Sequence, residues 1–591
     1  MPSYRLPFDL RPCYNECGHE CGASLADCPT YARLDPVLQE KCQQNWHLLQ
    51  YLHSLPIDEV GVPQYYQTIN RSLKSLKERN LIYPVTDNVF IHILGNQEDV
   101  RDHYIPIEPT LCDDLDRLLE QAEARLVDAA EDDDNLDDSK RVEVILKALD
   151  KLVTVKRFDK GNSPNQAGGQ GTGKKKKRSS AAKVSKNKLV LTRTQYDALR
   201  YVLRRKLEGL GVLDPLIHDN NIEDISCSGL GNVFVEHRVF GGLTATIAYE
   251  THDDLDKFVV ELAESIKHPV TFRSPTVDAT LPDGSRINII YGTDVSKRGS
   301  NFTIRKFSPV PMSIIELIQL GTLNYEMAAY LSLLCQEQMN IWVSGETASG
   351  KTTLMNALTT FIPPEAKIVS IEDTPEVQLP HANWIRGVSR GGSKLVQASD
   401  VSMFDLLKAA LRQRPNLIIV GEIRGEEGAI AFQAMQTGHA CMSTFHAATV
   451  TKLIQRLTGN PINVPKSYVD NLNAVVVAQQ VRLPNGATAR RVTSISEIVG
   501  YDSVEDVFSF IDVFVWKPLE DVFDFRGYMS SYLLEEKIAP RRGIPHEKRQ
   551  KIYMQIKQRA ELLRRIDEAG ITNFYDVHRV LTKAYRQGYF R

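Results

Sequence analysis

Residues 341–353 read IWVSGETASGKTT, and this stretch decides the fold class of the chain. From Gly345 to Thr352 it matches the phosphate-binding pattern G-x-x-x-x-G-K-[ST] at every fixed position. The apolar run Ile341 to Ser344 predicts a strand before the loop, and Thr353 to Leu358 predicts a helix after it. A chance glycine-rich turn would lack this strand–loop–helix context. The sequence therefore predicts an α/β domain whose parallel sheet carries a phosphate loop.

The residue types of this loop have a chemical purpose. Small residues let successive backbone N–H groups wrap around phosphates, and the following helix adds partial positive charge. Lys351 can reach the β- and γ-phosphates, while the Thr352 hydroxyl can ligate Mg²⁺. The predicted nucleotide-binding set, with ATP and Mg²⁺ as its ligands, is Gly345, Glu346, Thr347, Ala348, Ser349, Gly350, Lys351, Thr352 and Thr353.

Two later segments end in acids that suit the same site. Residues 416–424, NLIIVGEIR, form an apolar strand that delivers Glu422 at its carboxyl end, where a P-loop sheet holds an acid beside the metal. Residues 368–376, IVSIEDTPE, form another strand that ends in paired acids. There Glu372 is placed to polarise the attacking water.

A pair of histidines flanks a further short strand. Residues 437–446 read TGHACMSTFH, which puts His439 before the strand and His446 after it. Taken alone, each histidine is more often a core or surface residue than a functional one. Their position downstream of the two acidic segments makes them candidates for the nucleotide site.

In this order and spacing, the boxes GETASGKTT, IEDTPE, LIIVGEIRG and TGHACMSTFH resemble those of the secretion-superfamily ATPases. That family comprises the hexameric motors of type II and type IV secretion, type IV pili and archaella. The resemblance covers roughly residues 190–505, and the fragments DPLIHDNNIEDISCSG, LPDGSRINIIYG, RGSNFTIRKF and RRVTSISEIVGYD look like its archaeal branch. It implies a RecA-like P-loop domain preceded by a smaller α+β domain.

The resemblance also implies roles for single residues. Glu372 matches the catalytic acid, Glu422 the Walker B glutamate, and His439 and His446 the box in which one histidine senses the γ-phosphate. Arginines of the amino-terminal domain complete the cleft in this family, and the candidates in the matching stretch are Arg286, Arg298 and Arg305. Arginines of second rank, on either side of the Walker B strand, are Arg412, Arg414 and Arg424.

The 591 residues suggest three or four domains. We expect a Cys-rich leader over 1–48, a small α+β accessory domain over 49–160 and a flexible basic linker over 161–188. The amino-terminal domain of the motor follows over 189–310, then the P-loop domain over 311–505 and a helical carboxy-terminal extension over 506–591. The linker tract Lys174 to Arg178 is interpreted as a solvated charge run rather than a binding site.

The leader contains Cys13, Cys17, Cys21 and Cys28 within sixteen residues. Four thiolates so close together could hold tetrahedral Zn²⁺ or an iron–sulfur cluster, with His19 and Cys42 as substitute ligands. The spacing fits neither a common zinc knuckle nor a familiar ferredoxin run, so the metal stays open, and free or redox-active thiols are the alternative.

Composition limits the function. The chain has 71 basic and 74 acidic residues and a net charge of −3, so no global charge favours nucleic acid or an anionic membrane. Hydrophobic residues make up 42%, and no apolar run is long enough for a membrane span or a signal peptide. We therefore expect a cytoplasmic protein with no direct nucleic-acid partner, and the resemblance implies that it works at the inner face of the membrane.

The resemblance then implies an ATP-hydrolysing homohexamer that powers assembly of a type IV pilus-like, archaellum or secretion machine. Its partners would be a polytopic membrane platform protein and, indirectly, pilin-like or secreted substrates. A conjugation-type motor that moves DNA or protein is one alternative. A regulatory module that binds ATP without hydrolysing it is another, which the intact Lys351, Glu372 and Glu422 disfavour.

Overall fold

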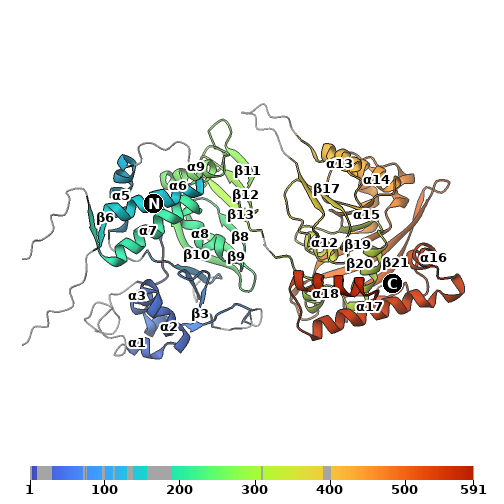
Figure 1. The fold of residues 1–591 in the computed structure, drawn as a ribbon, viewed down its shortest axis with the longest axis horizontal. Coiled ribbons are helices and arrows are strands. Elements are labelled where there is room, and N and C mark those ends of the chain that lie inside the picture. Colours follow the sequence, from blue (N-terminus) through green and yellow to red (C-terminus); the bar gives the residue numbers. More distant parts are fainter. Residues whose placement is uncertain are drawn as a thin grey trace, which may run out of the picture. The chain divides into compact units, whose positions relative to one another are not determined.

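The computed structural model describes residues 3–9, 29–70, 73–74, 76, 78–95, 100–110, 114–129, 138–155, 188–307, 310–389 and 401–589. The chain divides into two compact units, Met1–Phe307 and Ser308–Arg591 (Figure 1). In the part of the chain so described, no helix is both long and apolar enough to cross a membrane.

Unit 1 is built on one large sheet in the order β11-β12-β13-β8-β9-β10-β5-β4-β3-β2, with β1 also paired to β10. Its strands are β1 (Ser3–Tyr4), β2 (Gln64–Tyr65), β3 (Asn80–Pro84), β4 (Phe90–Leu94), β5 (His103–Ile107), β8 (Ile222–Cys227), β9 (Gly231–His237), β10 (Gly241–Tyr249), β11 (Thr276–Thr280), β12 (Arg286–Ile290) and β13 (Asn301–Arg305). The pairs are antiparallel except β10 with β5 and β2 with β3, which are parallel.

The helices of unit 1 cover this sheet or pack beside it. They are α1 (Pro29–Arg33), α2 (Pro36–Gln44), α3 (Trp46–Ser54), α4 (Ile57–Val60), α5 (Leu115–Ala129), α6 (Asp138–Leu152), α7 (Arg193–Glu208), α8 (Asp214–His218) and α9 (His252–Ser265). Alternate residues of β4 enter different cores: Ile91 and Ile93 join the cluster under α9, and Phe90 and Leu94 join the cluster under α1–α3. A smaller core joins α5, α6 and α7 with β6 (Val153–Val155) and β7 (Leu189–Leu191).

This arrangement differs from the domain boundaries expected at residues 48 and 189. Strand β5 pairs with β10 through His103–Thr244 and Tyr104–Ala245, so the region 64–107 extends the same sheet as residues 222–305. A buried Glu108 reinforces the junction, because it accepts hydrogen bonds from Tyr201 (2.7 Å) and Arg205 (2.6 Å) of α7. The accessory region and the amino-terminal region of the motor therefore form one body.

Unit 2 contains a nine-stranded sheet in the order β16-β15-β17-β18-β14-β19-β20-β21-β22. The strands are β14 (Ile341–Ser344), β15 (Ile368–Glu372), β16 (Trp384–Val388), β17 (Leu417–Ile423), β18 (Ala440–Phe445), β19 (Ala474–Arg482), β20 (Thr488–Asp502), β21 (Val507–Lys517) and β22 (Val522–Phe525). The six from β16 to β19 are mutually parallel, and β20, β21 and β22 continue the sheet in antiparallel pairs.

Helices cover both faces of this sheet, as a doubly wound α/β domain requires. One core gathers α10 (Ile314–Gln319), α11 (Tyr325–Gln336), α12 (Lys351–Thr359), α17 (Gln550–Glu568) and α18 (Phe574–Arg586). The other gathers α13 (Met403–Arg412), α14 (Glu427–Gln436) and α15 (Val450–Thr458). Along β14 the side chains alternate between them, with Ile341 and Val343 in the first and Trp342 in the second. The short α16 (Ala539–Arg541) precedes α17.

The expected helical extension thus begins with strands. Residues 507–525 form β21 and β22 of the P-loop sheet, and only then does the chain turn into the π-helical segment Leu533–Ile538 and the helices α16–α18. The sequence of β21, VFSFIDVFVWK, is rich in β-branched and aromatic residues, which is a strand signal.

Candidate nucleotide site

The phosphate loop lies in the middle of the parallel sheet of unit 2. Strand β14 runs between β18 and β19, and residues 345–350 lead from its carboxyl end into α12. Gly345 has no room for a side chain, since an added Cβ would lie 2.1 Å from the Ala478 carbonyl oxygen. Gly350 has φ +87° and Ala348 has φ +60°, so the loop turns twice through the left-handed region. These features produce the tight turn that the sequence predicted.

The amino end of α12 suits a phosphate. Its N-cap is Gly350, and no side chain caps its first N–H groups. Lys351, Thr352 and Thr353 are half-buried at this end, and the Lys351 Nζ donates to the Glu346 carbonyl oxygen over 2.9 Å. Uncapped amides, a helix amino end and a lysine on one loop are what a nucleotide's phosphates need.

Glu422 lies at the same end of the sheet. Strand β17 is separated from β14 only by β18, and the register sets Glu422 opposite Thr444, next to the Ser344–Phe445 pair. Its side chain is 30% exposed and accepts a hydrogen bond from Arg424 Nε over 3.0 Å. The predicted Walker B acid therefore lies at the end of the sheet where β14 enters the phosphate loop, and it forms an ion pair with Arg424.

Glu372 ends β15 and is closed off from solvent. Its Oε1 accepts from the backbone N–H groups of Glu376 (2.8 Å) and Val377 (2.6 Å), and Arg386 Nε lies 3.3 Å from Oε2. Only 1% of the side chain is exposed, and burial raises the pKa of this carboxyl to about 7. Gly421 makes room for it, because a Cβ there would lie 3.1 Å from the Glu372 Cγ. In this conformation Glu372 shapes the loop after β15 and has no open side for water.

Two carboxylates of the same box are exposed, Asp373, which accepts from Ser389 Oγ, and Glu376, which the sequence reasoning passed over. The Glu376 backbone carbonyl accepts from Asn356 Nδ2 of α12 over 3.1 Å, and Asn356 Oδ1 accepts from the Gln378 N–H over 3.2 Å. One side chain of the P-loop helix therefore holds the loop that carries Glu376. The third acid of IEDTPE was the available signal, and the first acid, Glu372, ends a strand that is buried throughout.

The two histidines are separated by the length of β18. His446 follows the strand at the P-loop end, and its Nδ1 lies 3.1 Å from the Gly345 carbonyl oxygen. His439 precedes the strand at the opposite edge of the sheet, roughly 20 Å away at the usual rise per residue, and bonds Thr437 Oγ1 over 3.1 Å. The structure therefore brings His446, and not His439, to the phosphate loop of its own unit.

The predicted arginines occupy two other regions. Arg412 and Arg414 precede β17, at the edge of the sheet opposite Glu422, and both are exposed. Arg286 and Arg305 are cross-strand neighbours on β12 and β13 of unit 1, and Arg286 bonds both carboxylate oxygens of Asp278. Arg298 is exposed in the loop between these strands. These three arginines belong to unit 1, and the phosphate loop belongs to unit 2.

The leader cysteines Cys13, Cys17, Cys21 and Cys28, with His19, lie outside the described residues. Cys42 is described: it is buried in α2 among Leu38 and Leu48, and burial raises the pKa of its thiol to about 12. It belongs to an apolar core rather than to a ligand set. Across the ranges that the structure describes, no three His, Cys, Asp or Glu side chains form a group that could hold a metal ion.

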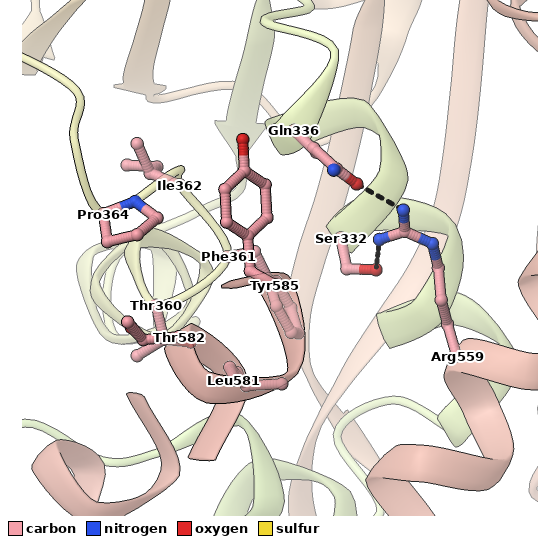
Figure 2. A pocket seen from close by; sticks show the side chains of 10 residues that line it. All are labelled: Ser332, Gln336, Thr360, Phe361, Ile362, Pro364, Arg559, Leu581, Thr582 and Tyr585. Carbon is pink, nitrogen blue, oxygen red and sulfur yellow. Dashed lines mark hydrogen bonds between the residues drawn. The ribbon is translucent and has the colours of Figure 1, made fainter. Parts of the chain in front are cut away.

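A small pocket lies at the far end of α12, away from the phosphate loop (Figure 2). Thr360 and Phe361 line it together with Leu581 and Tyr585 of α18. At its wall Arg559 of α17 donates to Ser332 Oγ over 3.1 Å and to Gln336 of α11, so the pocket marks where the carboxy-terminal helices join the P-loop domain.

Comparisons with known proteins show which family the chain resembles. The family model for "Type II/IV secretion system protein" matches residues 206–499, which begin in α7 and end in β20. The chain is 42% identical over 552 residues to an uncharacterized protein of Methanocaldococcus jannaschii, MJ0900, over 93% of this chain and 97% of that one. The regions before residue 206 and after residue 499 are therefore largely shared with that relative.

Two bacterial relatives carry functional names. The type IV secretion system protein PtlH of Bordetella pertussis is 30% identical over 319 residues, over 48% of this chain and 92% of PtlH. The probable conjugal transfer protein TrbB of Sinorhizobium fredii is 28% identical over 304 residues, over 50% of this chain and 90% of TrbB. Both are similar to about half of this chain.

Proposed function

The chain belongs to the type II/IV secretion system protein family, and from this premise we propose that it is an ATP-hydrolysing motor. The proposed motor powers assembly of a type IV pilus-like, archaellum or secretion machine at the cytoplasmic face of the membrane. The observation that carries the proposal is the gathering of Lys351, Glu422 and His446 around one phosphate loop.

In the proposed reaction the loop amides and Lys351 hold the phosphates, and Thr352 and Glu422 would hold Mg²⁺, which would neutralise charge on the phosphates. His446 donates its Nδ1–H to the Gly345 carbonyl, and its Nε2 would donate to the γ-phosphate when the imidazole carries a proton on both nitrogens. Glu376, an exposed carboxylate of the loop after β15, orients the attacking water. Glu372, Val377 and Asn356 fix that loop against α12.

We propose that copies of the chain form a homohexameric ring. The support is the placement of Arg286, Arg298 and Arg305 in unit 1 and of the phosphate loop in unit 2. Arginines supplied by a neighbouring subunit would complete the cleft, and ATP turnover would then move one unit against another. A polytopic membrane protein would receive that motion, with pilin-like or secreted proteins as indirect substrates.

Nucleotide affinity and turnover test the proposal together. Lys351→Ala is expected to weaken binding and to abolish phosphate release, because it removes the lysine that contacts the β- and γ-phosphates. Lys452→Ala, at an exposed lysine of α15, is the matched control and should behave as wild type. Wild-type turnover in the Lys351→Ala protein would contradict the assignment.

A conjugation-type motor is the second candidate, and the similarity to TrbB favours it. The two candidate functions can be distinguished by the effect of DNA on ATP hydrolysis. A motor that acts on DNA should hydrolyse ATP faster when DNA is added, whereas a pilus or secretion motor should be insensitive to DNA. The net charge of −3 supports the second outcome.

A further inference from the structure

Arg490 of β20 lies over the phosphate loop of its own unit. Its Nε donates to the Ala348 carbonyl oxygen over 3.0 Å. Its Cδ lies 3.3 Å from the place where a Cβ of Gly350 would stand. The arginine therefore contacts two of the loop residues just before Lys351, although 142 residues of sequence separate it from Ala348.

The sheet explains how this contact arises. Strand β19 runs beside β14, and its partner β20 returns antiparallel with Arg490 opposite Gln480. The return of β20 thus brings an exposed arginine back to the end of the sheet at which β14 enters the loop. The neighbouring Arg491 has a separate task, because it is buried and bonds Asp521 through Nε (2.8 Å) and Nη2 (2.8 Å).

The contacted residue has an unusual backbone. Ala348 has φ +60°, a left-handed conformation that a residue with a Cβ adopts at an energetic cost. Such a conformation persists when surrounding contacts hold it in place. The bond from Arg490 acts on the carbonyl of this residue, and so on the peptide plane that carries the Ser349 N–H.

We propose that Arg490 is a positioning residue of the nucleotide site, in the same subunit as the loop. It holds Ala348 in the left-handed conformation and so keeps the loop amides aimed at the phosphates. Arg490 also adds a second cation to the loop. The first is Lys351, whose Nζ donates to the carbonyl oxygen of Glu346, two residues before Ala348. The proposal rests on the proposed nucleotide-binding function and assigns the loop a partner outside its own motif.

The test is the affinity for Mg·ADP, measured by titration of the full-length protein, with the melting temperature as a check on folding. Arg490→Ala should weaken Mg·ADP about tenfold, the size of one charge-assisted hydrogen bond, without changing the melting temperature. Arg490→Lys should recover part of the loss, because it restores charge and a donor. Arg482→Ala, at an exposed arginine of β19, should bind as wild type.

A double variant separates positioning from simple charge. In Ala348→Gly the left-handed conformation is less costly, so adding Arg490→Ala should weaken binding less than it does in wild type. An unchanged penalty would overturn the positioning role. Wild-type affinity in Arg490→Ala, with binding lost in Lys351→Ala, would overturn the inference alone. No Mg·ADP binding by the wild-type protein would instead overturn the proposed function.

Discussion

Two carboxylates four residues apart in IEDTPE have opposite environments. Glu372 is buried and accepts two backbone N–H groups, whereas Glu376 is exposed at the other end of the loop. The sequence shows acids after a strand but not which of them turns inward, because that depends on the space left by Gly421 on the neighbouring strand. Strand order, and hence that neighbour, is set by long-range pairing.

The raised pKa of Glu372 predicts a pH-dependent stability. With a carboxyl pKa of about 7 when folded and 4.5 as its ordinary value, the native protein holds a proton that the unfolded chain releases. The contribution is complete below pH 4.5 and is lost as the pH rises through 7, by about 3 kcal/mol in total. Glu372→Gln should remove this dependence.

Urea unfolding at pH 5 and pH 8 measures the pH dependence of stability that Glu372 causes. The free energy of unfolding of Glu372→Gln minus that of wild type should be about 2.5 kcal/mol higher at pH 8 than at pH 5, because only wild type loses stability over this range. The exposed Glu376→Gln should show no such difference between the two pH values. Parallel pH profiles for wild type and Glu372→Gln would contradict the buried, protonated carboxyl.

At the scale of elements, α12 joins the phosphate loop to the rest of unit 2. Its amino end begins the phosphate site, its middle holds the loop of Glu376 through Asn356, and its far end meets α18 at the pocket of Figure 2. The helix itself is predictable from its apolar spacing. The partners of its single buried asparagine are not, because they follow from tertiary packing.

Asn356→Ala should therefore separate binding from chemistry. The phosphate loop stays intact, so the nucleotide affinity should remain within about twofold of wild type, whereas turnover should fall about tenfold as Glu376 loses its fixed position. Titration with Mg·ADP and steady-state phosphate release measure the two quantities. Equal losses in both would mean that Asn356 supports the whole fold instead of the loop.

The carboxy-terminal helices are attached to the sheet by a buried acid. Glu497 of β20 accepts from Tyr330 OH of α11 (2.6 Å), Ser531 Oγ (2.5 Å) and the Leu533 N–H (3.1 Å). Three elements distant in sequence thus meet at one fully buried side chain. Charged helices after residue 548 are evident in the sequence, but this attachment is not, because an isolated Glu in a strand has no periodic signature.

Glu497→Ala should leave three buried donors without an acceptor and lower the free energy of unfolding by about 3 kcal/mol. Hydrogen exchange should also show lower protection of α17 in that variant. Glu505→Ala, at an exposed glutamate in the turn after β20, is the control and should change neither quantity. Unchanged protection of α17 in Glu497→Ala would mean that apolar packing alone holds the helices.

At the scale of the whole molecule, the ordered motifs were sufficient to predict the P-loop sheet and its family. They were not sufficient to predict that β2–β5 extend the sheet of unit 1. The β5–β10 pairing consists of only two residue pairs, and it joins residues about 140 positions apart in the sequence. The leader cysteines remain a prediction of a metal or cluster site. Metal analysis of the purified protein would test it.

The ring predicts complementation between subunits. Lys351→Ala keeps the unit 1 arginines, and the double variant Arg286→Ala/Arg305→Ala keeps the phosphate loop, so each alone should be inactive. Mixed in equal amounts, they should regain part of the wild-type turnover, because some sites would combine an intact loop with intact arginines. If the mixture hydrolyses ATP no faster than either variant alone, the claim that a neighbouring subunit supplies the arginines is contradicted.

The most direct test of the central claim is single-turnover hydrolysis of radiolabelled ATP by the full-length protein, with Glu422→Gln beside the exposed control Glu426→Gln. The account predicts that wild type and Glu426→Gln release phosphate. Glu422→Gln should bind ATP with near wild-type affinity but release phosphate at least a hundredfold more slowly, because it lacks the carboxylate beside the metal. Phosphate release by Glu422→Gln at the wild-type rate, or none from wild type, would contradict the account.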